Sequence, residues 1–584
     1  MLKYRLSYNS PHQHLLYIHF TIPGVNADEL HVQLPAWRPG RYELGNFAQN
    51  IKTFQPKDSS GKKLQFEKVT KDCWKIYLKN DSNPPKADGI AKTVHIEYSY
   101  YANEMNAGST FLDEKQLYVN GVNCLLYVPE RINEPCELEL QLPKNYLVAT
   151  GLKKISAHKF SANDYHELVD CPLIASSTLQ KSQYTVQKTI FTVWFQGGIQ
   201  PDWKMLLNDF KKFTEAQHKL FGSFPFREYH FLFQALPEKF YHGVEHANST
   251  VIALGPSYGL MSGKGYEDLV GVSSHELFHA WNVKTIRPVE MMPYDYSREN
   301  YSRLGYVAEG VTTYYGDLML LRSGVSNEEQ YLKTFNDLLQ KHFNNLGRLN
   351  LSVADSSFDM WLDGYKQGIP GRKSSIYTEG ALCAFMLDVI IRRQTGNKNS
   401  LDDVMRALYD EFGKTKKGYS EEDYKKIAER IAGKSLDVFF ENYISETATY
   451  EPELINSFDY LGFELTKQKS NSFAEQALGF KTQAGGDKAT VASVFPNSPA
   501  DKAGLSLQDE IIAVNGMRVE GNLNEWCRHF SGTRKIKLTI STGRHLKEIL
   551  ISPDGNDYYF NYSATKRSEM SAAQKNNYNL WAMV

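Results

Sequence analysis

The sequence of 584 residues lacks an excess of charge of either sign, because 66 Lys and Arg face 67 Asp and Glu and leave a formal net charge of -1. A protein without a net field has no general attraction for nucleic acid or for an anionic membrane surface. Cysteine is also scarce. The six cysteines include no CxxC pair and none of the dense spacing of small secreted disulfide-rich domains, which favours a reducing compartment.

Long apolar runs are absent as well. The longest, residues 381–391, is interrupted by Asp388 and falls far short of the roughly 20 residues that a membrane helix requires. The N-terminus alternates apolar and polar residues from its fourth position and lacks the apolar core and cleavage site of a signal peptide. We therefore expect a soluble, cytoplasmic protein with neither membrane nor nucleic acid among its partners.

What the chain does contain is ample apolar material, 42% of its residues, enough for several globular domains. Residues 1–181 alternate with period two between clusters of Pro, Gly, Asn and Asp, which predicts an all-β domain. The segment Leu34–Phe47, LPAWRPGRYELGNF, breaks this alternation with prolines, glycines and aromatics. We expect a packed corner there, and the alternative is a loop presented toward a neighbouring active site.

Residues 182–455 change from mixed to helical patterning. Asp202 can cap a first helix that Gly222 ends, and 228–236 and 249–254 have the pattern of strands. Apolar residues then recur at helical spacing in 266–283, 303–321, 328–343, 377–394 and 401–412, which predicts helices there. Residues 456–555 return to short strands, with turns expected at Gly485-Gly486, Asn515-Gly516 and Thr542-Gly543, and residues 556–584 form a tail.

The strongest chemical signal is HELFH at His275–His279, within a segment predicted to be helical. Two histidines four positions apart share one helix face, so that both imidazoles can bind a single Zn²⁺. Glu276 between them lies beside the open metal position, where it can act as the general base toward a water molecule.

A catalytic zinc ion needs a third protein ligand, and two glutamates compete for that role. Glu299 lies 20 positions after His279, which is favourable spacing, but in a polar stretch that resembles a loop. Glu309 lies 30 positions after His279, in YVAEGVTTYYGDLML, where a helix can project its carboxylate toward the histidines. We favour Glu309, with Thr313 or Asp317 one and two turns further on as hydrogen-bond acceptors for a histidine. Spacing alone does not exclude Glu299 as the third ligand.

These motifs carry a family resemblance. HELFHAWNVKTIRP, then DY-x-REN-Y and AEGVTTYY, closely resembles the glycyl aminopeptidase family of gluzincin zinc metallopeptidases, and LPAWRPGRY is similar to that family's N-terminal signature. The resemblance implies an N-terminal β domain, an α+β thermolysin-like catalytic domain and a C-terminal PDZ domain. It also implies one zinc ion and supports Glu309 as the third ligand.

Two further segments resemble substrate-binding motifs of related gluzincins. YHGVEHANST, Tyr241–Thr250, is similar to an exopeptidase signature, which implies that Glu245 binds the substrate's α-ammonium group, with Gly243 beside it on an edge strand. Val244 and His246 depart from that signature. YTEGALCAFMLDVIIR resembles a segment whose tyrosine stabilises the oxyanion, which implies this catalytic role for Tyr377, although Glu379 replaces the usual lysine.

Ala477–Phe480 and Val491–Val519 resemble a PDZ domain. The backbone of Leu478, Gly479 and Phe480 would then hold a peptide's terminal carboxylate. The chain itself ends in Val584 and could occupy such a groove, although packing of Trp581 onto the body of the protein is the simpler interpretation.

The leading hypothesis is thus a zinc aminopeptidase acting on peptides with a free N-terminus, with Gly and Ala preference implied by the resemblance. The alternatives are a zinc endopeptidase with PDZ-assisted docking and a non-catalytic PDZ scaffold.

Overall fold

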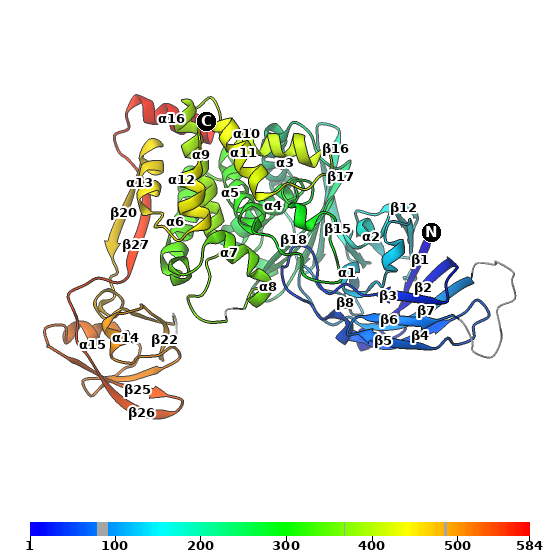
Figure 1. Ribbon diagram of the computed structural model, residues 1–584, viewed down its shortest axis with the longest axis horizontal. Helices are drawn as coiled ribbons and strands as arrows, with labels where there is room; N and C mark the ends of the chain where they lie inside the picture. Colours follow the sequence, from blue (N-terminus) through cyan, green and yellow to red (C-terminus); the bar gives the residue numbers. More distant parts are fainter. Residues whose placement is uncertain (79–91, 367, 484–487, 584) are drawn as a thin grey trace.

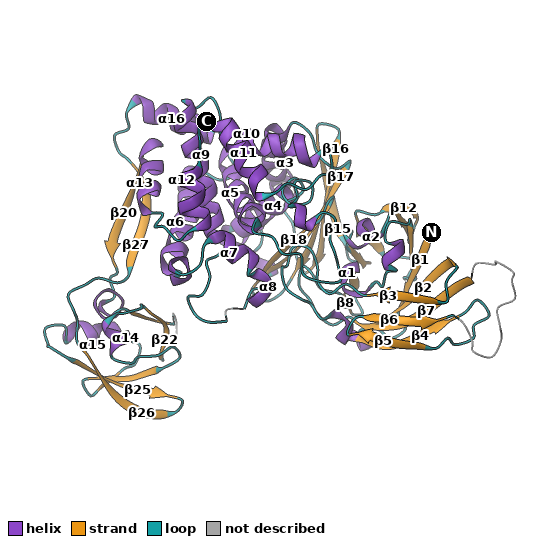
Figure 2. Cartoon of the chain, viewed as in Figure 1, coloured by secondary structure: helices purple, strands orange, loops and turns teal. Residues whose placement is uncertain are grey.

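The computed structural model describes residues 1–78, 92–366, 368–483 and 488–583. Figures 1 and 2 show a β-rich N-terminal part, a central body of helices around a sheet, and a small β domain at the end remote from the N-terminal part. This order confirms the predicted fold class of a β domain, an α+β domain and a small PDZ-like β domain. The residue numbers at which one predicted domain ends and the next begins stay predictions.

Among the described residues, the N-terminal part is built from three sheets. Strand β1 shows why the segments become strands, because Leu2, Tyr4 and Leu6 are buried while the residues between them face outward. The largest sheet has the order β12-β13-β10-β1-β2-β7-β4, and the smaller ones are β3-β6-β5 and β11-β14-β9-β8. Their strands are β1 Leu2–Ser7, β2 Leu15–Val25, β3 Glu29–Gln33, β4 Ile51–Lys57, β5 Phe66–Thr70, β6 Cys73–Tyr77, β7 Lys92–Tyr101, β8 Phe111–Leu112, β9 Gln116–Val119, β10 Cys136–Leu140, β11 Leu147–Thr150, β12 Lys153–Ser156, β13 Lys159–Ala162 and β14 Leu173–Ser176.

The central body contains a five-stranded sheet of order β15-β16-β17-β19-β18. Its strands are β15 Gln180–Val186, β16 Thr189–Gly197, β17 Glu228–Ala235, β18 Phe240–Glu245 and β19 Ser249–Gly255. The two strands predicted near 228–236 and 249–254 are β17 and β19. The third, β18, lies at the sheet edge and pairs antiparallel with β19 alone. An edge strand leaves one row of backbone N–H and C=O groups free to pair with another chain.

Helices cover the inner face of this sheet. Asp202 caps the first as predicted, because its carboxylate accepts a hydrogen bond from the Met205 N–H, and Gly222 ends it in the left-handed region. The longer helices are α3 Trp203–Phe221, α4 Gly263–Phe278, α5 Thr312–Arg322, α6 Glu328–Asn344, α9 Thr378–Thr395, α10 Leu401–Leu408, α11 Glu421–Ala432 and α13 Glu451–Tyr460, and the short ones are α7 Val353–Phe358, α8 Met360–Asp363 and α12 Asp437–Phe439. Their apolar faces form one core with the inner face of the sheet.

The N-terminal and central parts share buried surface. Trp37, in the predicted corner, is fully buried, donates a hydrogen bond from its indole N–H to the Asp295 carbonyl, and packs edge-on against Tyr294 and Trp361. The outer face of the central sheet packs against β9, β11 and β14 through a separate apolar cluster. The two parts therefore form one continuous body.

A buried ion pair joins the same two parts. Asp170, which follows α2 (Tyr165–Val169), lies 2.7 Å from the ammonium of Lys284, accepts from the Ala247 N–H and lies 3.2 Å from His246. The Lys284 side chain is 1% exposed. Although burial alone would raise it, the pKa of Asp170 is held well below its ordinary value by Lys284 and His246. This contact fixes the loop after α4 and the turn after β18 relative to the N-terminal part.

The small C-terminal domain has the sheet order β21-β22-β23-β25-β26, with β24 added to β23. The predicted turns at Asn515-Gly516 and Thr542-Gly543 connect β23 to β24 and β25 to β26, whereas Gly485-Gly486 lies outside the described residues. The elements are β21 Phe480–Thr482, β22 Ala489–Val494, α14 Pro499–Lys502, β23 Glu510–Val514, β24 Met517–Arg518, α15 Leu523–His529, β25 Ile536–Thr542 and β26 His545–Ile551.

Both ends of this domain return to the central body. β20 (Phe463–Lys469), which precedes the domain, pairs antiparallel with β27 (Phe560–Lys566), which follows it. The chain then forms α16 (Ala572–Ala582), where Trp581 is buried and donates from its indole N–H to the hydroxyl of Tyr314. The segment that the sequence predicts as a tail therefore packs on the central body. Val584 lies outside the described residues. Within those residues, no helix has the length and apolarity needed to cross a membrane.

The buried Asp170–Lys284 pair predicts a large effect of removing one partner. We expect Asp170→Asn to lower the free energy of unfolding of the central body by about 3–5 kcal/mol, because Lys284 then stays buried without a counter-ion. Urea denaturation followed by tryptophan fluorescence measures this change. Adding Lys284→Met should restore part of the loss. The half-exposed pair Lys57–Glu97 is the control, since Glu97→Gln should cost at most about 1 kcal/mol. If Asp170→Asn and Glu97→Gln lowered the free energy of unfolding equally, the result would contradict the conclusion that the buried Asp170–Lys284 pair is the more important of the two ion pairs.

Candidate active site

The two histidines of the HELFH motif lie at the C-terminal end of α4. His275 is in its last turn and His279 is its C-cap residue. Their Nε2 atoms lie 3.0 Å apart. The Nδ1 atom of His279 lies 2.7 Å from the carbonyl oxygen of Asn282, which orients the ring and leaves Nε2 to face His275.

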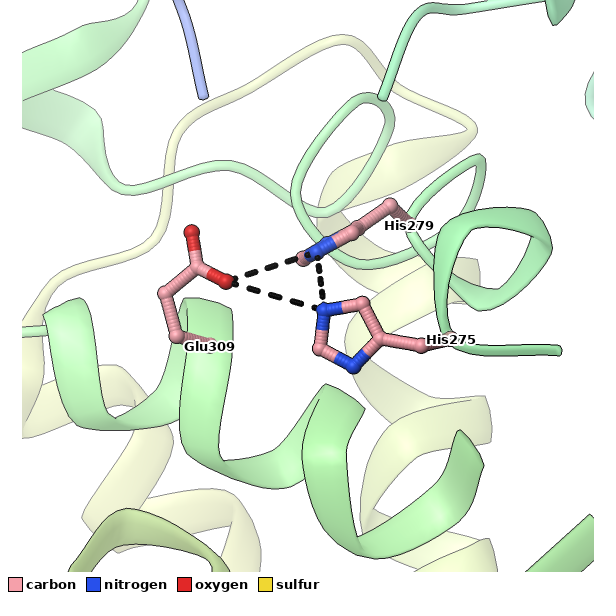
Figure 3. Close-up of side chains that lie close together, drawn as sticks. All are labelled: His275, His279 and Glu309. Atoms are coloured by element: carbon pink, nitrogen blue, oxygen red, sulfur yellow. Dashed lines mark hydrogen bonds and ion pairs between the residues drawn. The ribbon is translucent and has the colours of Figure 1, made fainter. Parts of the chain in front are cut away.

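Glu309 approaches the same point from a second element. It lies in a π-helical segment, Tyr306–Val311, that continues directly into α5, a local geometry that is frequent at functional sites. One carboxylate oxygen lies 3.4 Å from Nε2 of His279 and 3.9 Å from Nε2 of His275. Figure 3 shows the three side chains converging on one another from the two helical segments.

The other carboxylate oxygen of Glu309 is held by the N-terminal part of the chain. The hydroxyl of Tyr42 donates a hydrogen bond to it at 3.2 Å, and both side chains are buried. On the opposite side, the Asn282 amide donates to the Val307 carbonyl at 2.9 Å and to the Thr312 hydroxyl at 3.0 Å. Asn282 therefore links the end of α4 to the segment that carries Glu309.

The expectation that Thr313 or Asp317 orients a histidine is wrong for His279, whose partner is the Asn282 carbonyl. The hydroxyl of Thr313 donates instead to the Glu309 carbonyl within its own helix. Side-chain spacing along a helix does not reveal this acceptor, because it is a main-chain group in the loop after α4.

The buried charges of the site perturb one another. Burial and the neighbouring His279 lower the pKa of His275 well below its ordinary value. Burial raises the pKa of Glu276 to about 8, to which the carboxylates of Glu245 and Glu309 contribute against the opposing charge of His279. Although burial opposes it, Glu309 raises the pKa of His279 to about 10. Three carboxylates and two imidazoles thus share one buried space, which a divalent cation would neutralise.

The donor set fits a zinc ion. The ligand atoms of His275, His279 and Glu309 all lie within 4.8 Å of one another, and two imidazoles with one carboxylate are ordinary ligands of catalytic zinc. His279 also belongs to a second such group with Glu245 and Glu276. Glu299 joins neither group among the described residues and lies in a turn between Asp295 and Asn300.

Glu276 and Gly243 face each other across the floor of the site. A Cβ atom on Gly243 would lie 2.2 Å from a carboxylate oxygen of Glu276, so the lack of a side chain at Gly243 leaves the space that the Glu276 carboxylate occupies between β18 and α4. The other oxygen of Glu276 is buried and has no hydrogen-bond partner among the described residues. A buried carboxylate oxygen without a partner is costly unless a ligand or water satisfies it.

Glu245 is buried at the end of β18, and Gly40 of the Leu34–Phe47 loop lies directly against it. A Cβ atom on Gly40 would lie 2.4 Å from a Glu245 carboxylate oxygen, and the backbone of Gly40 has a positive φ of 80°. The second Glu245 oxygen has no partner among the described residues. The predicted corner is therefore both packed, through Trp37, and presented to the site, through Gly40 and Tyr42.

Tyr377 is the N-cap residue of α9, and its hydroxyl lies 3.2 Å from that of Tyr365. Burial and the charge of Glu309 raise the pKa of Tyr377 well above its ordinary value, so the phenol stays protonated and can donate. Both tyrosines line the cleft that also contains His275, Glu276 and Glu245. This cleft has a volume of about 650 Å³.

The predicted PDZ loop lies in the small domain (Figure 1), and Leu478, Gly479 and Phe480 do not line this cleft. Leu478 and Phe480 are buried, and Gly479 has a positive φ of 79°. The Gly479 carbonyl accepts hydrogen bonds from the Phe495 N–H and the Ser498 hydroxyl. The structure therefore does not bring this loop to the zinc site, and its role in binding peptides stays a prediction.

Tyr42, Gly40, Asn282 and Tyr365 are site residues for which sequence reasoning gave no role. The only signal for the first two was the dense Pro, Gly and aromatic composition of LPAWRPGRY. Asn282 lies inside the resemblance segment HELFHAWN, whereas nothing in the pattern around Tyr365 singles it out.

Comparison with family models identifies the three parts. Residues 3–177 match the Peptidase M61 N-terminal domain, residues 268–383 match the M61 glycyl aminopeptidase model, and residues 490–540 match a PDZ domain. These matches confirm the family recognised from the sequence. A search of curated proteins gives no match.

Among solved structures, an aminopeptidase N family protein from Idiomarina loihiensis is similar over the whole of both chains, with 25% identity and a TM-score of 0.88. An M1 zinc metallopeptidase from Deinococcus radiodurans is more distant, at 12% identity and a TM-score of 0.48 over 77% of this chain and 94% of that chain. The first likeness extends to the arrangement of all three parts.

Metal binding discriminates between the two candidate third ligands. We expect Glu309→Gln to weaken zinc binding by at least about 100-fold, more than the loss of an outer hydrogen-bond partner does, whereas Glu299→Gln leaves it unchanged. Competition with a chromophoric chelator measures the affinity, and elemental analysis measures the metal content. Loss of zinc in Glu299→Gln with retention in Glu309→Gln would reverse the assignment.

Proposed function

Because the chain is a peptidase that carries the domains of the M61 family, we propose that it is a zinc-dependent aminopeptidase releasing single small residues, glycine or alanine, from the N-termini of peptides. The observation that carries the proposal is the buried Glu245 carboxylate at the end of edge strand β18. It lies two residues from Gly243, where Glu276 faces the strand.

A free N-terminus explains this arrangement physically. Glu245 and Gly243 are roughly 6.6 Å apart along a strand, about the span of two residues of an extended peptide pairing with β18. An α-ammonium group at Glu245 would therefore bring the first peptide bond of the substrate next to Glu276. The unpaired Glu245 oxygen supplies the hydrogen-bond acceptor that such a cation needs.

The loop from the N-terminal domain supports release of single residues rather than internal cleavage. Gly40 lies so close to Glu245 that a Cβ atom on it would come within 2.4 Å of a carboxylate oxygen, so the loop backbone lies beside the proposed amine position. In the proposed arrangement, a substrate that continued past this point would meet that backbone. The preference for glycine or alanine rests on the description of the matched family model as a glycyl aminopeptidase.

In the proposed mechanism, His275, His279 and Glu309 would hold a zinc ion, which when bound would lower the pKa of a water molecule and polarise the scissile carbonyl. Glu276 accepts the proton of the attacking water and transfers it to the leaving amine. Its buried carboxylate has one oxygen without a hydrogen-bond partner among the described residues, which leaves that oxygen available to the water. The Tyr377 hydroxyl donates a hydrogen bond to the oxyanion that develops in the transition state.

The first test of this proposal is the hydrolysis of Gly- and Ala-p-nitroanilide by the zinc-loaded protein. We expect activity that is lost on chelation and restored by zinc, with kcat about 10²–10⁴-fold lower in Glu276→Gln because the general base is missing. Glu245→Gln should mainly raise KM, since it removes the charge that binds the amine.

An N-acetylated substrate separates an aminopeptidase from an endopeptidase. The wild-type protein should not cleave it, and Glu299→Gln serves as a carboxylate control with wild-type rates. Cleavage of acetylated peptides at internal bonds would favour the endopeptidase alternative. A zinc-loaded, folded protein inactive on both substrates would favour the PDZ scaffold.

The role of Tyr377 gives a separate test. We expect Tyr377→Phe to lower kcat by about 10²–10³-fold with little change in KM, because the lost hydrogen bond forms mainly in the transition state. Tyr365→Phe is the matched control, since it removes the neighbouring hydroxyl 3.2 Å away. A large loss of kcat in Tyr365→Phe alone would move the oxyanion role to Tyr365.

A further inference from the structure

The cleft does not end at the candidate zinc ligands. It continues along one face of α4 toward that helix's N-terminus, past Gly271, where an added Cβ atom would meet open space, to Asp268 and Lys264. The facing walls come from α5, through Asp317, and from α6, through Asp337. This far arm contains several charged side chains that the proposed mechanism does not use.

Strand β18 gives the direction of a bound peptide. Glu245, Gly243 and Tyr241 alternate along it, so that the proposed amine anchor, the reacting centre and Tyr241 follow one another at intervals of roughly 6.6 Å. A peptide whose amine lies at Glu245 pairs antiparallel with β18 and passes Glu276 before it reaches Tyr241. The far arm therefore receives the residues that follow the cleaved bond.

Asp317 is the unpaired carboxyl group of this arm. No hydrogen bond or ion pair involving its carboxylate occurs within the part of the chain that the structure describes. Burial raises the pKa of Asp317 to about 7, against the opposing charges of Lys264 and Lys341. Lys264 is itself engaged, because its ammonium lies 2.8 Å from Asp268.

The remaining charges of the arm do not reverse its sign. Glu267 accepts a hydrogen bond from Gln330 and Asp337 lies on the exposed rim. The arm is thus lined by four carboxylates, Glu267, Asp268, Asp317 and Asp337, against the two ammonium groups of Lys264 and Lys341. Its net charge is negative, which attracts a cationic group and repels an anionic one.

Tyr241 adds an independent reason to expect a cation. Its side chain is 60% exposed and lines the same cleft. Asp317 and Asp268 line this cleft together with Tyr241. Desolvation by the surrounding chain raises the pKa of the Tyr241 hydroxyl, and the two carboxylates raise it further. An accessible aromatic ring and an unpaired carboxylate in one cleft are groups that bind ammonium and guanidinium ions.

We propose that Asp317, together with Tyr241, selects peptides that carry a lysine or arginine at the first or second residue after the cleaved bond. This inference rests on the proposed aminopeptidase function and adds a substrate class to it: peptides with a small N-terminal residue followed closely by a basic one. The long side chain of lysine or arginine can extend along the far arm while its charge replaces the missing partner of Asp317.

The test compares C-terminally amidated tetrapeptides Ala-Xaa-Ala-Ala and Ala-Ala-Xaa-Ala, in which Xaa is lysine, norleucine or glutamate. We expect kcat/KM for lysine to exceed that for norleucine by about tenfold at one of the two positions, with glutamate poorest, as for one partly desolvated ion pair. In Asp317→Asn the lysine-to-norleucine ratio should fall to within about twofold of unity. The norleucine peptide is the internal reference for any general loss of activity.

Glu329→Gln is the matched control, because Glu329 is exposed in the first turn of α6 and does not line the cleft. Its lysine-to-norleucine ratio should equal that of the wild type. The wild-type preference should also weaken as salt concentration rises, which needs no variant to fold.

Three outcomes overturn the inference. In the first, the wild-type protein hydrolyses Ala-p-nitroanilide but shows no preference for lysine at either position. This result would overturn the inference and leave the aminopeptidase proposal intact. A preference that survives in Asp317→Asn assigns selection to another group. Inactivity of the zinc-loaded wild type on Ala-p-nitroanilide would overturn the proposed function and this inference together.

Discussion

The site depends on one constraint, the burial of the Glu309 carboxylate where α4, the segment Tyr306–Val311 and the N-terminal domain meet. One oxygen faces His275 and His279 from α4, and the other accepts from Tyr42 of the N-terminal domain. A carboxylate cannot be buried cheaply, so these partners must be present together. The site therefore requires the N-terminal domain to be docked, and the Trp37 contacts and the Asp170–Lys284 pair supply that docking.

Close backbone approach is the second requirement, and glycine meets it at several points. Gly310 lies against Gly380, where a Cβ atom would come within 2.3 Å of the facing Cα atom, so that the Glu309 segment and α9 can touch. Gly243 and Gly40 play the same part beside Glu276 and Glu245. Each glycine removes a side chain where two elements, one of them carrying a functional carboxylate, must meet.

Local chemistry could be predicted from the sequence, and contacts between distant segments could not. The i, i+4 spacing of His275 and His279 requires only one helix, and the structure supplies it. Glu309 could be favoured over Glu299 because a helical pattern surrounds it. Tyr42 lies 267 positions from Glu309 and no periodicity connects them, so its contact depends on how two domains dock. The acceptor for His279 is a main-chain carbonyl, which leaves no mark in side-chain patterns.

The C-terminal domain illustrates the same limit at the level of architecture. Its sequence pattern predicts an appended module followed by a tail, but β20 and β27 pair across it, with β27 packed on α6 and β20 on α13. Asn336 of α6 exchanges hydrogen bonds with both backbone groups of Ala564, and Asn344 accepts from Lys481 at the start of the module. The neighbouring face of α6, through Asp337 and Lys341, lines the cleft. One helix thus forms a wall of the cleft and anchors both ends of the module, so the position of the module is fixed relative to that wall.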